Sequence, residues 1–92
     1  MNNARRSLIR KVIKSLKTGS FDWDDIEVDL NDILYDETEA MENIPESLQD
    51  TDRYRICEKS VELLEEAIGY IDPEDSDAAD SVVEVLNQID GV

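Results

Sequence analysis

Apolar residues recur along most of this chain at intervals of three and four positions, the spacing that places side chains on one face of an α-helix. The same spacing appears before Gly19, from Ile26 to Ile44 and from Ala79 to Ile89. No stretch shows the sustained alternation of a half-buried strand. We therefore predict an all-α protein with helices over about 3–17, 23–43, 51–70 and 75–89. The most regular series is Tyr54, Cys57, Val61, Leu64, Ile68 and Ile71.

Two helix-breaking positions suggest how the segments are arranged. Gly19 is expected to cap the first helix, and Pro73 separates the third from the fourth. Both breaks lie at similar distances in sequence from a predicted turn at 45–50. We expect one domain over 1–92, an antiparallel helical hairpin or small bundle of four helical segments, with the first helix against the fourth. Leu63, Ala67 and Tyr70 widen the apolar face of the third helix, which favours packing on the fourth helix or on another protomer, so a homodimer is an open alternative.

Charge is distributed very unevenly between the two ends of the chain. The protein has 24 acidic and 9 basic residues, a net charge of −15. The first 20 residues contain six bases and no acid, whereas residues 21–52 contain thirteen acids and no base. We expect the basic first helix to pair with acids within the molecule or across a dimer. Contact of this helix with nucleic acid or with an anionic membrane is a weaker alternative. Because the net negative charge of the protein repels a duplex, no direct binding of duplex DNA is expected.

Several features favour a protein that is neither secreted nor membrane-bound. Cys57 is the only cysteine, so no internal disulfide can form. Arg10 and Lys11 interrupt the apolar residues near the start, which is unlike a secretory signal peptide. No apolar run has the length of a membrane span. We expect a cytoplasmic location and no membrane partner.

The residues that enzymes most often use are poorly represented. Histidine is absent, and Cys57 lies on an apolar face where an inert thiol is expected. Calcium loops counted from Asp22 or Asp72 lack the required glycine at the sixth position. We interpret the aspartate clusters at 22–25 and 72–77 mainly as helix N-termini, with a weak divalent-cation site as the lesser alternative. No enzymatic activity, cofactor or bound metal is expected.

The most distinctive feature is a row of acids beside the apolar stripe of the second helix. Its members step by three and four residues, so on a helix they form one continuous acidic ridge with a charge about every 5 Å. The mild interpretation is a solvated surface that keeps the protein soluble, but a surface without any base is unusual. The candidate partner-binding residues are this acidic ridge (Asp22, Asp25, Asp29, Asp32, Asp36 and Glu39) together with Asp24, Glu42 and Trp23.

Trp23 has two interpretations of its own. With Phe21 it lies between the first and second helices, where two rings are expected to pack over the joint. The alternative is an exposed aromatic anchor for a partner.

Two short stretches resemble a known group of proteins. They are the opening Asn2-Asn3-Ala4-Arg5-Arg6 with Ile9, and the turn Glu42-Asn43-Ile44-Pro45-Glu46-Ser47-Leu48-Gln49, the latter followed by Arg53-Tyr54. Together they are similar to small acidic helical proteins encoded by phages and mobile elements of Gram-positive bacteria. Members of that group look like proteins of two long uninterrupted helices joined at this turn. The present chain departs from that pattern at 18–25 and 69–73. The resemblance implies a phage or mobile-element setting, in which small acidic proteins often block host enzymes.

These observations lead to two functional hypotheses. In the first, the protein is a non-catalytic DNA mimic of the anti-CRISPR or anti-restriction type. Its acidic ridge then occupies the basic nucleic-acid-binding surface of a host protein. In the second, it is a structural or adaptor protein that binds a partner through apolar helix faces.

Overall fold

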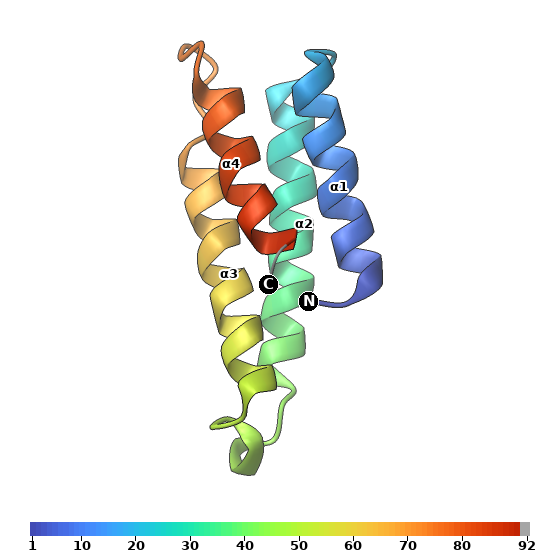
Figure 1. Ribbon diagram of the computed structural model, residues 1–92, viewed down its shortest axis with the longest axis vertical. Coiled ribbons are helices and arrows are strands. Elements are labelled where there is room, and N and C mark those ends of the chain that lie inside the picture. Colours follow the sequence, from blue (N-terminus) through green and yellow to red (C-terminus); the bar gives the residue numbers. More distant parts are fainter. Residues whose placement is uncertain (91–92) are drawn as a thin grey trace.

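The structure, a computed structural model, describes residues 1–90 as four α-helices and one short 3₁₀ segment (Figure 1). No strand occurs in this part of the chain, so the all-α prediction is confirmed. The helices are α1 (Asn3–Thr18), α2 (Trp23–Glu42), α3 (Asp52–Gly69) and α4 (Ala78–Asp90), and the 3₁₀ segment η1 (Glu46–Leu48) lies in the turn between α2 and α3.

The four helices run side by side along the longest dimension of a body measuring 44 × 21 × 21 Å (Figure 1). The packing of α2 on α3 is the most extensive, followed by α3 on α4 and α4 on α1. The contact between α1 and α2 is the smallest of the four. The lower ends of α2 and α3 extend past α1 and α4 and carry the turn with η1 (Figure 1).

The ends of α1 and the start of α2 follow from local capping chemistry. The Asn2 side chain accepts a hydrogen bond from the backbone N–H of Arg5 at 2.8 Å. Gly19 ends α1 in the left-handed region, at φ 73°, and its N–H bonds to the carbonyl of Leu16. Asp22 caps α2 by accepting from the N–H of Asp24 at 2.9 Å. The predicted roles of Gly19 and Asp22 are confirmed.

The fourth helix begins at Ala78, three residues later than the start predicted at 75. The Asp72 side chain accepts from the N–H of Glu74, and the Asp75 side chain accepts from the N–H of Asp77. These local bonds hold the segment in turns, because aspartate offers its own backbone an alternative to the helical pattern. The aspartates at 72–75 therefore act in the α3–α4 turn, before the helix starts.

A single hydrophobic core draws on all four helices. On α3 the buried face is centred on Cys57, Ser60, Leu64 and Ala67, whereas predicted stripe members such as Ile68 are only half-buried. This shift arises because α3 packs against both α2 and α4 and buries a face wider than one stripe. The core residues contributed by the other helices are Ile9, Val12, Ile13, Leu16, Ile26, Leu30, Ile33, Val82, Val85, Leu86 and Ile89.

Candidate functional site

The six acids predicted to form the acidic ridge lie along α2 and its N-cap, and all of them are exposed. Because α2 is continuous from Trp23 to Glu42, the ridge extends roughly 25 Å from end to end at the usual rise per residue. Within residues 1–90, no ridge carboxylate forms an ion pair with a basic group. The ridge is thus a continuous row of charges, none of which is ion-paired with a base of the described chain.

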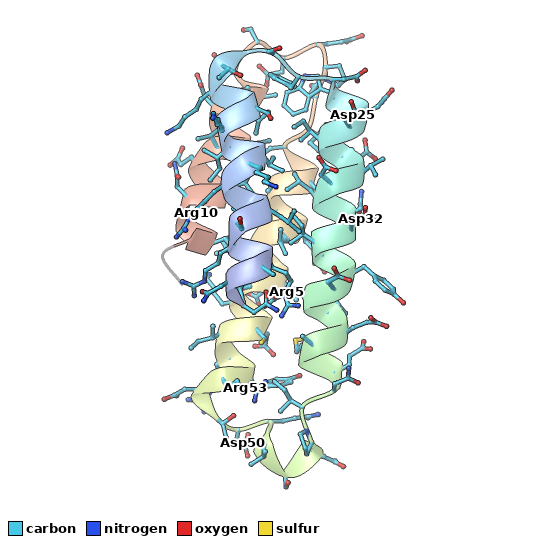
Figure 2. All side chains as sticks on the ribbon, turned by 90° about the vertical axis from the view of Figure 1, so that its right-hand side faces the viewer. Arg5, Arg10, Asp25, Asp32, Asp50 and Arg53 are labelled. Atoms are coloured by element: carbon cyan, nitrogen blue, oxygen red, sulfur yellow. The ribbon has the colours of Figure 1, made fainter. Side chains whose placement is uncertain are left out.

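Three ridge members also form one wall of a groove, which we call the α1–α2 groove. Asp29, Asp32 and Asp36 face α1 across it, and its volume is about 200 Å³. Figure 2 shows α1 and α2 from this side, with Asp25 and Asp32 on α2 and Arg10 on the far flank of α1, near α4. The remaining lining residues are Ile33 from α2 and Leu8, Lys11, Val12 and Ser15 from α1.

The outward face of α2 carries two exposed apolar residues among its acids. The side chains of Val28 and Tyr35 are 58% and 63% exposed and lie seven residues apart, two helical turns. Tyr35 is hydrogen-bonded to Glu39, and this bond, reinforced by the carboxylate's negative charge, raises the pKa of the phenol above its ordinary value. Acidic and apolar groups are therefore interleaved on this face.

The two ends of α2 differ in their electrostatics. Asp24 and Asp25 lie in the first turn, where the helix dipole favours negative charge. The last turn has no base and contains Glu39 and Glu42, whose charges oppose the dipole. The acids near the C-terminal end of α2 therefore lower the stability of the isolated helix.

Trp23 packs where α1 and α2 join. Its ring meets that of Phe21 edge-on, with centroids 4.9 Å apart, and both rings lie against the core. The packing interpretation is confirmed. Trp23 is half-buried, and part of its side chain stays exposed. Binding of a partner through this exposed part remains a prediction.

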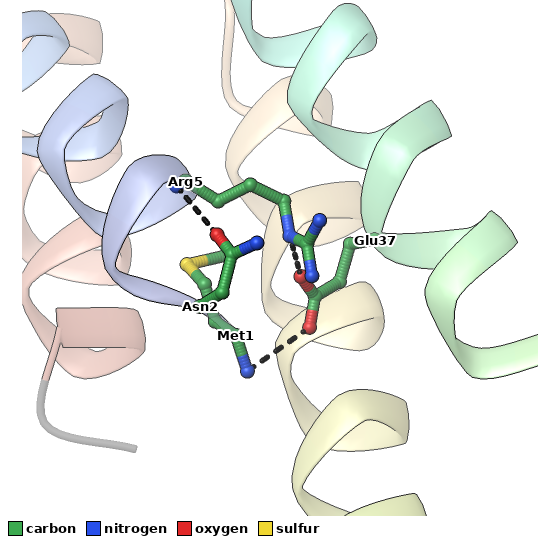
Figure 3. A network of polar contacts seen from close by, with 4 residues as sticks. All are labelled: Met1, Asn2, Arg5 and Glu37. Carbon is green, nitrogen blue, oxygen red and sulfur yellow. Dashed lines mark hydrogen bonds and ion pairs between the residues drawn. The ribbon is translucent and has the colours of Figure 1, made fainter. Parts of the chain in front are cut away.

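A buried ionic cluster surrounds Glu37, and it was not predicted from the sequence (Figure 3). The Glu37 side chain is fully buried on α2. Arg5 Nε lies 2.6 Å from Glu37 Oε2, and the backbone amine of Met1 lies 3.3 Å from Oε1. A signal was present, because Glu37 occupies a position of the apolar stripe between Ile33 and Ile44.

The basic residues of α1 are divided between different surroundings. Arg5 pairs within the molecule as predicted, but with α2 and not with the fourth helix. In the part of the chain that the structure describes, Lys11, Lys14 and Lys17 make no ion pair. The fold therefore neutralises only part of the charge difference between the basic helix α1 and the acidic remainder of the chain.

Three observations on residues 1–90 concern metal ligands, the single cysteine and membrane-spanning helices. No group of three or more cysteine, aspartate or glutamate side chains is placed to hold a metal ion there. Cys57 is buried on α3. None of the helices described combines the length and the apolar character that crossing a bilayer requires.

Comparison with known proteins adds no relative. No protein-family model, no curated protein sequence and no solved structure matches this chain.

Proposed function

We propose that the protein is a non-catalytic inhibitor that binds the basic nucleic-acid-binding surface of a host protein through its acidic ridge, as a mimic of DNA. The observation that carries this proposal is the unpaired state of the ridge carboxylates within the described chain. An anti-restriction or anti-CRISPR role in a phage or mobile element is the setting we propose for it.

The energetics of α2 support a ridge that has a partner. Two carboxylates about 6 Å apart repel by about 0.7 kcal/mol in bulk water, and salt weakens this repulsion. The ridge contains five such neighbouring steps, from Asp22 to Glu39, and α2 supplies no base to relieve them. A partner with clustered lysine and arginine side chains removes the repulsion and gains attraction, which also accelerates encounter.

The geometry of the ridge suits a surface that holds phosphates. Its charges are spaced about 4.5 to 6 Å apart along the helix, against about 3.4 Å for phosphates along one DNA strand. The ridge is less dense than a DNA strand, and the neighbouring acids Asp24 and Glu42 add charge at its two ends. A groove that contacts several phosphates at once accepts this row without base-specific contacts.

Charge reversal provides the test. The triple variant Asp29→Lys, Asp32→Lys and Asp36→Lys is expected to lose inhibition of DNA cleavage by purified restriction and CRISPR nucleases. The matched control reverses Glu58, Glu62 and Glu65, three exposed acids on α3 with a similar spacing. We expect the control to inhibit as the wild type does, with helix content checked by circular dichroism for both. Equal inhibition by the two triple variants would contradict the proposal, as would a failure of the wild type to inhibit any nuclease.

A second candidate is an adaptor that binds through apolar helix faces. The observation that favours it is the exposure of Val28 and Tyr35 on one face of α2, with Tyr70 exposed at the C-cap of α3. This alternative predicts binding that salt does not weaken and that Val28→Ser with Tyr35→Ser removes. Homodimer formation through such a face is part of this alternative, and light scattering coupled to size-exclusion chromatography measures it.

A further inference from the structure

The α1–α2 groove differs from the rest of the acidic ridge because it has an apolar floor. Val12 and Ile33 are core residues that form its base, and Leu8 at its edge stays 43% exposed. Asp29, Asp32 and Asp36 stand along one side. A surface that only attracted phosphate-binding groups would need the carboxylates alone, so the exposed Leu8 side chain beside the buried Val12 and Ile33 requires a separate explanation.

The dimensions of the groove indicate what fits it. Its volume of about 200 Å³ is below the range of about 300–1,000 Å³ for small-molecule pockets. On α1 it is lined by positions 8, 12 and 15, which extend over two helical turns, about 10 Å. A trough of this length between two helices suits the apolar side chains of a helix laid along it, with anchors at intervals of three and four residues.

The charge of the groove lining determines which kind of helix can bind in it. The groove has three carboxylates and one cation, Lys11, and Lys11 forms no ion pair in the described part of the chain. A second copy of this protein carries the same net charge of −15 and is repelled at long range. A helix with arginine or lysine beside its apolar anchors complements both the wall and the floor.

We infer that the α1–α2 groove binds a basic amphipathic helix of the target protein, which inserts apolar side chains against Leu8, Val12 and Ile33 and pairs its cations with Asp29, Asp32 and Asp36. The inference rests on the proposed function, because the acidic ridge supplies one wall of the groove. It narrows the partner from any phosphate-binding surface to one in which a basic helix is accessible.

Two synthetic peptides of about 20 residues test this directly. One carries leucines at intervals of three and four with arginines beside them, and the other has the same composition in scrambled order, without an apolar face. By titration calorimetry we expect the amphipathic peptide to bind at least about tenfold more tightly than the scrambled one. The Leu8→Ala variant should bind the amphipathic peptide about fivefold more weakly than the wild type does, because part of the apolar surface that Leu8 buries against the peptide is lost. Lys11→Ala should bind it about threefold more tightly, because a competing cation is gone.

Leu48→Ala is the matched control. Leu48 is 49% exposed, close to the value for Leu8, but it lies in η1 at the far end of the molecule. Its affinity for either peptide should equal that of the wild type. In NMR spectra of the bound wild type, the methyl signals of Leu8, Val12 and Ile33 should shift and those of Leu48 should not.

The other outcomes separate this inference from the proposed function. Equal binding of both peptides, lost on charge reversal at 29, 32 and 36 but unaffected by Leu8→Ala, overturns the groove and leaves the acidic ridge as a binding surface. A dimer that Leu8→Ala dissociates assigns the groove to a second copy and also overturns it. If neither peptide binds, the inference is wrong, and the nuclease assay decides the proposed function independently.

Discussion

Glu37 is a charged residue in a core position, and its environment explains how it is tolerated. Moving a carboxylate out of water is unfavourable by several kcal/mol unless opposite charges and hydrogen bonds replace the water. Arg5 Nε donates to one carboxylate oxygen at 2.6 Å, and the Met1 amine approaches the other. The contact joins the first turn of α1 to the C-terminal half of α2, so it fixes the position of one helix along the other.

Removing one partner of this cluster should be more harmful than removing both charges. We expect Arg5→Met to lower the free energy of unfolding by about 3 kcal/mol, because a buried carboxylate then has lost its hydrogen-bonded cation. The double variant Arg5→Met with Glu37→Gln should be more stable than Arg5→Met alone, since the unpaired charge is gone. Urea denaturation followed by circular dichroism measures both values.

Arg55→Met is the control for this pair of variants. Arg55 is an exposed arginine on α3, and its replacement should change stability by no more than about 0.5 kcal/mol. If Arg5→Met were as mild as Arg55→Met, Glu37 would not depend on Arg5.

The two glycines at helix ends illustrate how backbone geometry determines each helix boundary. Gly19 has φ 73°, a left-handed conformation that L-amino acids with a Cβ adopt only at a cost of roughly 1–2 kcal/mol. Gly69 is the last residue of α3, and it is helical. A Cβ added at either position meets no atom within 4 Å, so an alanine clashes with no neighbour at either one. The two positions therefore differ only in their backbone conformation.

The same substitution should therefore have opposite effects at these two positions. Gly19→Ala is expected to destabilise the protein by about 1 kcal/mol, a loss of roughly 4–8 °C in Tm for a domain of this size. Gly69→Ala is expected to stabilise it by about 0.5 kcal/mol, because alanine is the better helix former. Calorimetry of the two variants checks the signs, and a gain in Tm for Gly19→Ala would contradict the role of the left-handed cap.

Helix positions could be predicted from the sequence because each helix buries one face, so its apolar residues repeat with the helical period. The start of α4 could not, because the bonds from Asp72 and Asp75 to nearby N–H groups compete with helix formation. The ionic cluster was missed because Glu37 interrupts the apolar pattern, and its partner Arg5 is 32 residues away in sequence. The α1–α2 groove could not be predicted from the sequence for a similar reason, since Leu8 and Asp32 are brought together only by the packing of α1 on α2.

At the scale of the whole molecule, net charge opposes the compact state. A protein of 92 residues with a charge of −15 experiences self-repulsion that salt reduces, because the Debye length shortens from about 30 Å at 0.01 M to about 3 Å at 1 M. The exposed acids of α2 and α3 contribute most of this charge. The ion pairs of Glu37 with Arg5 and with the Met1 amine are largely buried, and salt screens such pairs weakly.

Added salt should therefore stabilise this protein. Raising NaCl from about 0.02 M to about 0.5 M is expected to increase Tm by about 5 °C, corresponding to about 1 kcal/mol. The triple variant with lysine at 29, 32 and 36 has less net negative charge and should respond less. A fall in Tm with salt would show that attractive surface pairs outweigh the repulsion.

The packing of α1 on α4 has a consequence for how the protein is made. A ribosome synthesises α1 before the other three helices, yet one of the two helices that α1 packs against begins about 60 residues after α1 ends. At about 5–20 residues per second, that interval lasts roughly 3–12 s. Until α4 is synthesised, the surface of α1 that packs against it stays uncovered, while α2 and α3 can already pair across a short turn. The helix synthesised earliest of these four is thus among the last of them to complete its contacts.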